Sequence, residues 1–259
     1  MTNGGEQHLG RANKQAILEA KGYLVDWDGC CAIENSIVPS AEKFLRFNHA
    51  RTAIVSNNSS NTIAEFQYVL QKSGIFMRSE QIILAGIESI KRAVELESKR
   101  TLVLGSLSMR AAARAHGLTL ENEDVDLVIL MRDTRFNYQR LERAVNAILN
   151  GARLIISNPD LTHPGVDGRV KPETGALLAA LGACIDLSSV ELEIIGKPSQ
   201  IIFDKGCKSI DLESSEVVMF GDNPVTDIAG AKAFGMHSIL ASPTPSIFFQ
   251  NILDTLKIF

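Results

Sequence analysis

The sequence has few of the residues that mark secreted, membrane-spanning or metal-clustered proteins. Its 259 residues include four cysteines, too few for a disulfide framework, and their spacing does not match a zinc site. Reduced thiols in a cytoplasm are the simpler interpretation. No segment approaches the roughly 20 consecutive apolar residues of a membrane-spanning helix. The N-terminal stretch lacks the apolar segment of a secretory signal.

Positive charge does not predominate: the chain has 26 lysines and arginines and 30 aspartates and glutamates, and the formal net charge is −4. A nucleic-acid-binding surface would need clustered lysine and arginine, so we expect no nucleic-acid partner. The 45% hydrophobic and 22% charged residues are typical of a globular protein, and the length predicts one or two domains. We therefore expect a cytoplasmic protein without a membrane partner.

Apolar runs alternate with helix-like stretches, and this alternation predicts an α/β fold with a parallel sheet. Strands are expected near residues 22–26, 52–56, 193–196, 217–220 and 237–240, and helices near 40–48, 61–73, 199–210 and 225–235. A second alternation of strands and helices runs from about residue 101 to about residue 184. We therefore predict a Rossmann-like core made of residues 1–85 and 191–259, with an inserted α/β domain over residues 86–190.

Two carboxylates follow the first predicted strand. Asp26 and Asp28 flank Trp27, and Gly29 comes next. A turn at the strand end can bring Asp26 and the side chain and carbonyl of Asp28 around one point, where they would attract a hard cation. Magnesium prefers oxygen ligands in octahedral geometry. Such a site would combine a metal, a carboxylate nucleophile and a second carboxylate that moves a proton. Taken alone, these four residues are more typical of a strand that ends in a turn.

Two more predicted strands end in groups that suit phosphate. Ser56, Asn57 and Asn58 follow an apolar strand and precede a helical stretch. Hydroxyl, amide and backbone N–H donors before a helix N-terminus can bind a phosphate oxyanion. Lys197 follows another apolar run and can neutralise phosphate charge as a point cation.

A further predicted strand, near residues 217–220, ends in the acids Asp222 and Asp227. In an open α/β sheet, ligands bind outside the carboxyl ends of the strands. Four strands that each carry a phosphate- or metal-competent group at that end therefore predict one site rather than independent turns.

Together, these segments resemble the signatures of the haloacid dehalogenase superfamily of phosphatases. The segments are, in order, DWDG at 26–29, the serine of VSNN at 56, the lysine of GKPS at 197 and GDNPVTD at 221–227. The insert, with NPDLTHP at 158–164, is similar to the class IIA cap of the 4-nitrophenylphosphatase-like, sugar-phosphate and pyridoxal phosphate phosphatases. The resemblance extends from about residue 20 to about residue 245.

The resemblance implies a magnesium-dependent phosphomonoesterase that acts on a sugar phosphate, a polyol phosphate or pyridoxal phosphate. Asp26 would be the nucleophile that forms an aspartyl-phosphate, and Asp28 the general acid and base. Lys197 would also belong to the catalytic group. The implied metal ligands are Asp26, Asp28, Asp222 and Asp227.

Substrate binding is implied for Ser56, Asn57, Asn58 and Lys197 around the phosphoryl group, and for His163 at the leaving group. A lone loop histidine is often only solvated, so His163 is equally compatible with a solvent-exposed loop position. Asp227 could instead hold Lys197 or serve a helix dipole. Asn158 and Asp160 are more typical of residues that build the loop's turns than of residues that line a pocket.

The motifs alone are compatible with more than one reaction and more than one set of partners. A phosphotransferase or mutase on the same fold would share every motif, and a non-catalytic phosphate-ligand sensor is a rival from another class. The expected partner is a small-molecule phosphate ester, and a homodimer is left open. Cys30 and Cys31 follow the first motif directly and raise the question of oxidative inhibition near Asp26.

Overall fold

The computed structural model describes residues 9–33, 36–164, 169–241 and 244–258. The chain forms two compact units. Unit 1 consists of residues 1–55, 67–82 and 203–259, and unit 2 of residues 56–66 and 83–202. This division by compactness does not test the functional boundaries predicted at 85/86 and 190/191, which stay a prediction. No helix in the described part of the chain is both long and apolar enough to cross a membrane.

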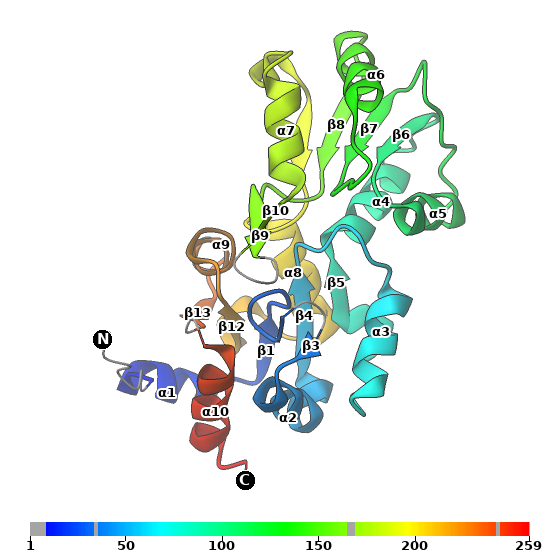
Figure 1. Ribbon diagram of the computed structural model, residues 1–259. Coiled ribbons are helices and arrows are strands. Elements are labelled where there is room, and N and C mark those ends of the chain that lie inside the picture. Colours follow the sequence, from blue (N-terminus) through cyan, green and yellow to red (C-terminus); the bar gives the residue numbers. More distant parts are fainter. Residues whose placement is uncertain (1–8, 34–35, 165–168, 242–243, 259) are drawn as a thin grey trace. The chain divides into compact units, whose positions relative to one another are not determined.

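A five-stranded sheet has the order β13-β12-β1-β4-β5 (Figure 1). Its strands are β1 (Gly22–Val25), β4 (Thr52–Ser56), β5 (Ile82–Leu84), β12 (Val217–Gly221) and β13 (His237–Leu240). β1 pairs in parallel with both β4 and β12, and β12 with β13. Every residue of β1, β4 and β12 is buried, as expected for central strands of a parallel sheet. The α/β fold class predicted from the sequence is confirmed.

The helices of this part of the chain are α1 (Arg11–Glu19), α2 (Pro39–Asn48), α3 (Ile63–Lys72), α8 (Gln200–Ser209), α9 (Gly230–Ala233) and α10 (Pro245–Leu256). Two short antiparallel strands, β2 (Ala32–Ile33) and β3 (Ser36–Ile37), come after the first acidic motif. Helices α2, α3 and α8 lie close to the predicted positions, whereas the short strands of this part of the chain were not predicted.

The core of unit 1 is aromatic. The ring of Phe220 in β12 stacks on that of Tyr23 in β1, with centroids 5.4 Å apart. Phe44 of α2 and Phe249 of α10 pack on each other at 5.5 Å, and α2 and α10 lie side by side (Figure 1). Each such ring buries roughly 150–250 Å² and packs edge-on or offset, which fixes the strands that carry the acidic motifs.

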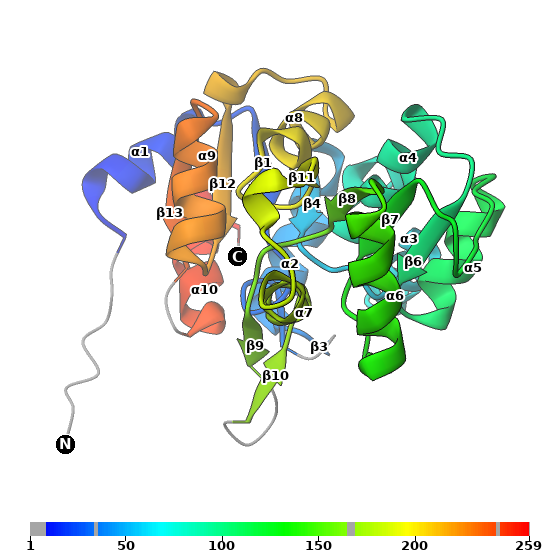
Figure 2. The same cartoon turned by 90° about the horizontal axis from the view of Figure 1, so that it is seen from above.

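Unit 2 has its own sheet, with the order β11-β8-β7-β6 and all pairings parallel. The strands are β6 (Thr101–Leu104), β7 (Leu127–Leu130), β8 (Arg153–Ile156) and β11 (Leu192–Ile194), and the helices are α4 (Ala85–Glu95), α5 (Leu107–Ala115), α6 (Tyr138–Leu149) and α7 (Thr174–Gly182). A hairpin of β9 (Thr162–Pro164) and β10 (Val170–Pro172) lies beside α7 (Figure 2).

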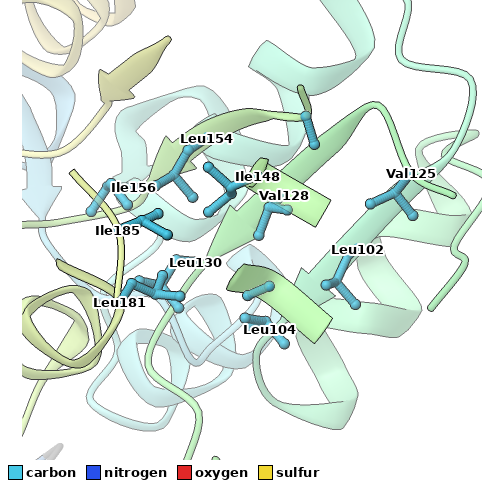
Figure 3. Close-up of a cluster of buried hydrophobic side chains, with 12 residues drawn as sticks. Leu102, Leu104, Val125, Val128, Leu130, Ile148, Leu154, Ile156, Leu181 and Ile185 are labelled. Atoms are coloured by element: carbon cyan, nitrogen blue, oxygen red, sulfur yellow. The ribbon is translucent and has the colours of Figure 1, made fainter. Parts of the chain in front are cut away.

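A cluster of aliphatic side chains forms the core of unit 2 (Figure 3). Strands β6, β7 and β8 each contribute alternate residues to one face, as the two-residue repeat of a strand requires. Helix α6 and the segment around α7 cover that face. The members labelled in Figure 3 include Leu104, Leu130, Ile148, Ile156 and Leu181.

The structure corrects two predictions. The strand expected at 193–196 is β11 at 192–194, and it pairs with β8 in the sheet of unit 2 rather than with the five-stranded sheet. An apolar run of this length shows that a strand exists but not which strand it pairs with. The helix expected at 225–235 is instead a one-turn π-helix, Pro224–Ala229, followed by α9. β5, α4 and the β9–β10 hairpin were not predicted.

Candidate active site

The first acidic motif forms a tight loop at the end of β1. The Asp26 N–H donates to the Phe220 carbonyl at 2.8 Å, so pairing with β12 continues one residue past the strand. The loop then closes on itself, because the Ala32 N–H donates to the Trp27 carbonyl at 2.9 Å and the Gly29 N–H donates to the Ala32 carbonyl at 2.9 Å. Gly29 has φ +87°, a conformation that favours glycine.

The second acidic motif is fixed by Asn223. Its Oδ1 accepts from the N–H groups of Val225 at 2.9 Å and Thr226 at 3.2 Å, and so caps the π-helix at 224–229. The Asn223 N–H donates to Oδ2 of Asp227 at 3.0 Å. Single π-helical turns occur often at functional sites, and this one carries Asp227.

Three carboxylates from these two loops come together. Asp26, Asp222 and Asp227 each offer an oxygen, and the three oxygens lie within 4.8 Å of one another. Asp26 and Asp227 are buried, and Asp222 is half-buried. At this separation two like charges repel by roughly 3–4 kcal/mol at an effective dielectric constant of about 20. A cation would remove that repulsion.

The glycines next to the three acids show whether the cluster has the space that a metal site needs. A Cβ at Gly29 would overlap the Asp222 carboxylate, and a Cβ at Gly221 would overlap the Asp227 carboxylate. The carboxylates can therefore occupy these positions only because neither glycine has a side chain. The donor set consists only of carboxylate oxygens, which suits a hard divalent cation such as magnesium.

Asp28, the fourth predicted metal ligand, has an exposed side chain and is not one of the three clustered acids. Its side chain forms part of the loop surface, next to the bridge between Asp28 and Ala32. The sequence thus predicted three side chains that the structure brings together, and the role of Asp28 stays a prediction.

The predicted phosphate-binding residues of unit 2 form a hydrogen-bonded loop after β4. Ser56 is 1% exposed, and its Oγ accepts from the Asn58 N–H at 3.1 Å. Oδ1 of Asn58 accepts from the N–H groups of Ser60 at 3.1 Å and Asn61 at 3.0 Å. The Asn58 side chain thus orders the turn that precedes α3.

Asn57 is bonded directly to Lys197, 140 residues away in the chain. Its Oδ1 accepts from the Lys197 N–H at 2.7 Å, and its Nδ2 donates to the Lys197 carbonyl at 3.1 Å and to Oδ2 of Asp160 at 2.8 Å. Asn158 donates in turn to the Asn57 carbonyl at 2.8 Å. Lys197 itself is 2% exposed. The Asn57 side chain therefore positions the lysine turn.

His163 lies on β9, close to an acid that the sequence did not single out. Its Nδ1 is 2.7 Å from Oε1 of Glu173, and Nε of Arg132 is 3.4 Å from the same oxygen. His163 keeps about a quarter of its side chain exposed. The Glu173 carboxylate thus lies beside the imidazole, where it forms an ion pair when the ring is protonated.

Sequence reasoning missed the supporting roles of Glu173 and Asp160, because no local spacing connects either residue to its partner. It correctly placed Asn158 and Asp160 in a turn: the Asp160 N–H donates to Oδ1 of Asn158 at 3.2 Å. The Oγ of Ser59, in the loop after β4, accepts from the Arg132 N–H at 3.0 Å.

The thiols beside the first motif are protected. Cys30 and Cys31 are fully buried, and all four cysteines are free. A hydrogen bond with Cys31 and burial raise the pKa of Cys30 well above its ordinary value, and the charges of Asp26 and Asp222 raise it further. The thiolate is the form that oxidants attack, so this environment disfavours the oxidative inhibition that the sequence raised as a question.

Comparisons with known proteins agree with these motifs. Residues 23–119 match the family described as haloacid dehalogenase-like hydrolase, and residues 194–242 match a related HAD-hydrolase-like family. An acid sugar phosphatase of Staphylococcus haemolyticus is 30% identical over 224 residues, which cover 85% of this chain and 84% of that protein. A 5′-nucleotidase of Bacillus subtilis is also 30% identical, over 85% of this chain and 86% of its own length.

Solved structures show the same architecture. The structure of a thermostable NPPase variant of Geobacillus stearothermophilus superposes with a TM-score of 0.75. The two chains are 28% identical, and the match covers 86% of this chain and 88% of the other.

Proposed function

The chain belongs to the haloacid dehalogenase-like hydrolases, as a class IIA phosphatase for small phosphorylated substrates, and on this basis we propose a magnesium-dependent phosphomonoesterase that works through an aspartyl-phosphate. The observation that carries the proposal is the cluster of Asp26, Asp222 and Asp227. Its acids come from two adjacent parallel strands, and Asp26 heads the loop where the family's nucleophile is expected.

Asp26, Asp222 and Asp227 would hold the magnesium ion, together with the backbone carbonyl of Asp28. When bound, the cation would lower the charge repulsion between Asp26 and a phosphate dianion. The glycine contacts support this assignment, because the acids fill space that any larger residue at Gly29 or Gly221 would take.

The chain's own residues would then carry two steps. An Asp26 oxygen attacks phosphorus, the bond from phosphorus to the leaving oxygen breaks, and Asp28 donates a proton to that oxygen. Asp28 next takes a proton from a water molecule, which attacks the aspartyl-phosphate and releases inorganic phosphate. Asp28 is exposed, so it can exchange protons with solvent between the steps.

The phosphoryl oxygens would be bound by Ser56, Asn57, Asn58 and Lys197. The hydrogen bonds of Asn57 to both sides of Lys197 favour a positioning role for its side chain. Lys197 would supply a positive charge from a buried position.

The inserted domain, proposed at residues 86–190, would select the leaving group, with His163 as a contact. A sugar phosphate, a polyol phosphate or pyridoxal phosphate is the proposed substrate. The acid sugar phosphatase and the 5′-nucleotidase among the relatives support a small phosphate ester of this kind. Four free cysteines favour a reducing compartment, and we propose the cytoplasm.

The test is phosphate release from a panel of phosphomonoesters, measured with magnesium, with EDTA, and with calcium in place of magnesium. Activity should require magnesium, and calcium should support little turnover because its coordination is larger and looser. Full activity after chelation would contradict the metal assignment. Transfer of the phosphoryl group to an added sugar or polyol, without release of phosphate, would favour a phosphotransferase instead.

A further inference from the structure

A second concentration of charge lies in unit 2, at the edge of its sheet. A pocket of about 390 Å³ opens beside edge strand β6, between α5 and α6. Of the described residues that line it, five are arginines and none is acidic. We call it the arginine pocket, and its arginines are Arg110, Arg114, Arg135, Arg140 and Arg143.

Two helices turn basic faces toward this pocket. Arg110 and Arg114 are four residues apart on α5, and Arg140 and Arg143 are three residues apart on α6, so each pair shares a helix face. Arg140 also lies in the first turn of α6, which contains no acidic residue. Positive side chains are unfavourable at the positive end of a helix dipole, so an anion would gain from both sources of charge.

Among the residues that the structure describes, most of this charge has no carboxylate partner. Arg140 is paired with the buried carboxylate of Asp133. In the part of the chain that the structure describes, Arg110, Arg114, Arg135 and Arg143 form no ion pair with a carboxylate. Arg110 donates instead to a neutral group, the Val103 carbonyl, at 3.3 Å.

The arginines also act on one another. Burial lowers the pKa of Arg110, and the positive charges of Arg114, Arg140 and Arg135 lower it further, against the smaller opposite effect of Asp133. The folded protein thus holds five positive charges close together, and among the described residues only Arg140 is paired with a carboxylate, that of Asp133. Acids such as Asp124 and Glu142 line a neighbouring hollow, which shares Asn122 and Arg143 with the arginine pocket.

The floor of the arginine pocket is apolar. Leu102 and Leu104 come from β6 and also belong to the core cluster in Figure 3, and the exposed Leu107 begins α5. Leu102 and Leu104 are each only 2% exposed, so the pocket offers a charged rim for phosphate groups and an apolar surface that Leu107 mainly supplies. Its volume lies within the range of about 300–1,000 Å³ that is usual for small-molecule sites.

We propose that the arginine pocket is a second ligand site, which binds a small organic diphosphate or triphosphate. Guanidinium groups bind phosphate oxygens in a bidentate way, and several of them would be needed to match a di- or triphosphate. A nucleic acid fits less well, because the chain carries a net charge of −4 and acidic residues adjoin the pocket. The pocket shares no residue with the carboxylate cluster, and its existence does not depend on the proposed reaction.

The test is isothermal titration calorimetry with ADP and with pyrophosphate, in EDTA and low salt, so that metal-dependent binding at the carboxylate cluster is suppressed. The test variant is Arg114→Gln with Arg135→Gln, since both side chains are exposed and support no core contact. The control is Lys99→Gln with Arg153→Gln, which removes two positive charges of the same unit that do not line the pocket, and which also removes the ion-pair partner of Glu191. Thermal unfolding checks that both variants fold.

We expect both probes to bind the parent protein, ADP more tightly than pyrophosphate because of the apolar floor. The test variant should weaken ADP binding at least tenfold, the control by less than twofold, and neither should lose phosphatase activity. Absence of binding in EDTA, or equal weakening by both variants, would overturn the proposal. Binding of a 20-base-pair DNA duplex in 150 mM salt more tightly than ADP would also overturn it, in favour of a nucleic-acid surface.

Discussion

The side chain of Asn57 forms hydrogen bonds with both backbone groups of Lys197, its N–H and its carbonyl. Its Oδ1 accepts from the Lys197 N–H at 2.7 Å, and its Nδ2 donates to the Lys197 carbonyl at 3.1 Å. Two residues that are 140 positions apart in the chain are therefore fixed as one element. A substitution of Asn57 should therefore also disturb the position of Lys197.

Asn57→Ala should lower both stability and activity. It removes three side-chain hydrogen bonds, and a buried unsatisfied group costs about 1–3 kcal/mol. We expect kcat to fall at least tenfold with intact secondary structure, measured by phosphate release and circular dichroism. The control is Asn146→Ala, which loses one hydrogen bond on an exposed helix face. A kcat equal to that of the control would exclude the positioning role.

Asp26→Asn should remove turnover without unfolding the protein. The amide has the shape of the carboxylate but cannot attack phosphorus, and it weakens the metal site. The variant should melt within a few degrees of the parent or above it, because one of three mutually repelling charges is gone. Residual activity within about tenfold of the parent, a barrier change of only ~1.4 kcal/mol, would contradict its role as the nucleophile.

Gly29→Ala should raise the magnesium concentration needed for half-maximal activity, because the added Cβ displaces the Asp222 carboxylate. The chain offers a matched control in Gly117, whose φ of +92° is close to the +87° of Gly29 but whose Cβ would meet no atom within 4 Å. Both substitutions should cost about 1–2 kcal/mol of stability through backbone strain. Only Gly29→Ala should shift the magnesium dependence. The same shift in Gly117→Ala would mean that strain alone is responsible.

His163→Ala should change the order of substrates more than the chemistry. A contact made equally in ground and transition states raises KM and leaves kcat nearly unchanged. The loss should amount to about 0.5–1.5 kcal/mol for the best substrate if the hydrogen bond is neutral. For 4-nitrophenyl phosphate the loss should be slight. Equal losses for all substrates would remove His163 from the substrate contacts.

Glu173→Gln provides the companion experiment. It keeps the shape of the side chain but removes the negative charge 2.7 Å from His163 Nδ1. If Glu173 orients the imidazole, this variant should reproduce part of the KM change of His163→Ala, and the double variant should add little to it. Full additivity of the two changes would show that the residues act independently.

The protein should lose stability as the pH rises above about 9. Burial, and then the negative charges of Asp204 and Glu213, raise the pKa of Cys207 from its usual 9.0 to about 12. Between these values the unfolded chain has lost the thiol proton and the native state has kept it. The free energy of unfolding should therefore fall by up to ~1.4 kcal/mol per pH unit from this thiol.

Urea unfolding between pH 8 and 11 under reducing conditions measures this slope. Cys207→Ala should show a shallower slope than the parent, whatever its absolute stability. Cys30 keeps its own contribution of the same sign, since its pKa is also raised. An unchanged slope in Cys207→Ala would contradict the assignment.

The sequence predicted best what depends on local pattern. Apolar runs, and the turn residues between them, predict the strands β1, β4, β12 and β13 and most of the helix positions. All three clustered acids could be found from the sequence, because the carboxyl ends of parallel strands meet at one edge of the sheet. The partner of β11 could not, since strand pairing depends on contacts that are distant in the chain.

Side-chain partners were the least predictable part of the site. Nothing in the spacing of Asn57 and Asp160, or of His163 and Glu173, distinguishes these pairs from other polar loop residues. The π-helix at 224–229 was equally hidden, because its first residues look like the start of an ordinary helix. Such details arise when the tertiary structure chooses among local conformations of similar energy.

The Asn223 cap affects how the proposed site would bind a cation, because it orders the loop in advance. The loop from Asp222 to Asp227 is already closed by hydrogen bonds to both the side chain and the main chain of Asn223. Ordering a residue costs about 1–2 kcal/mol of conformational entropy, and here that cost falls on folding. We therefore expect that a cation at the proposed site would bind without ordering this loop, and that loss of its own hydration water, rather than rearrangement of the chain, would limit the binding rate.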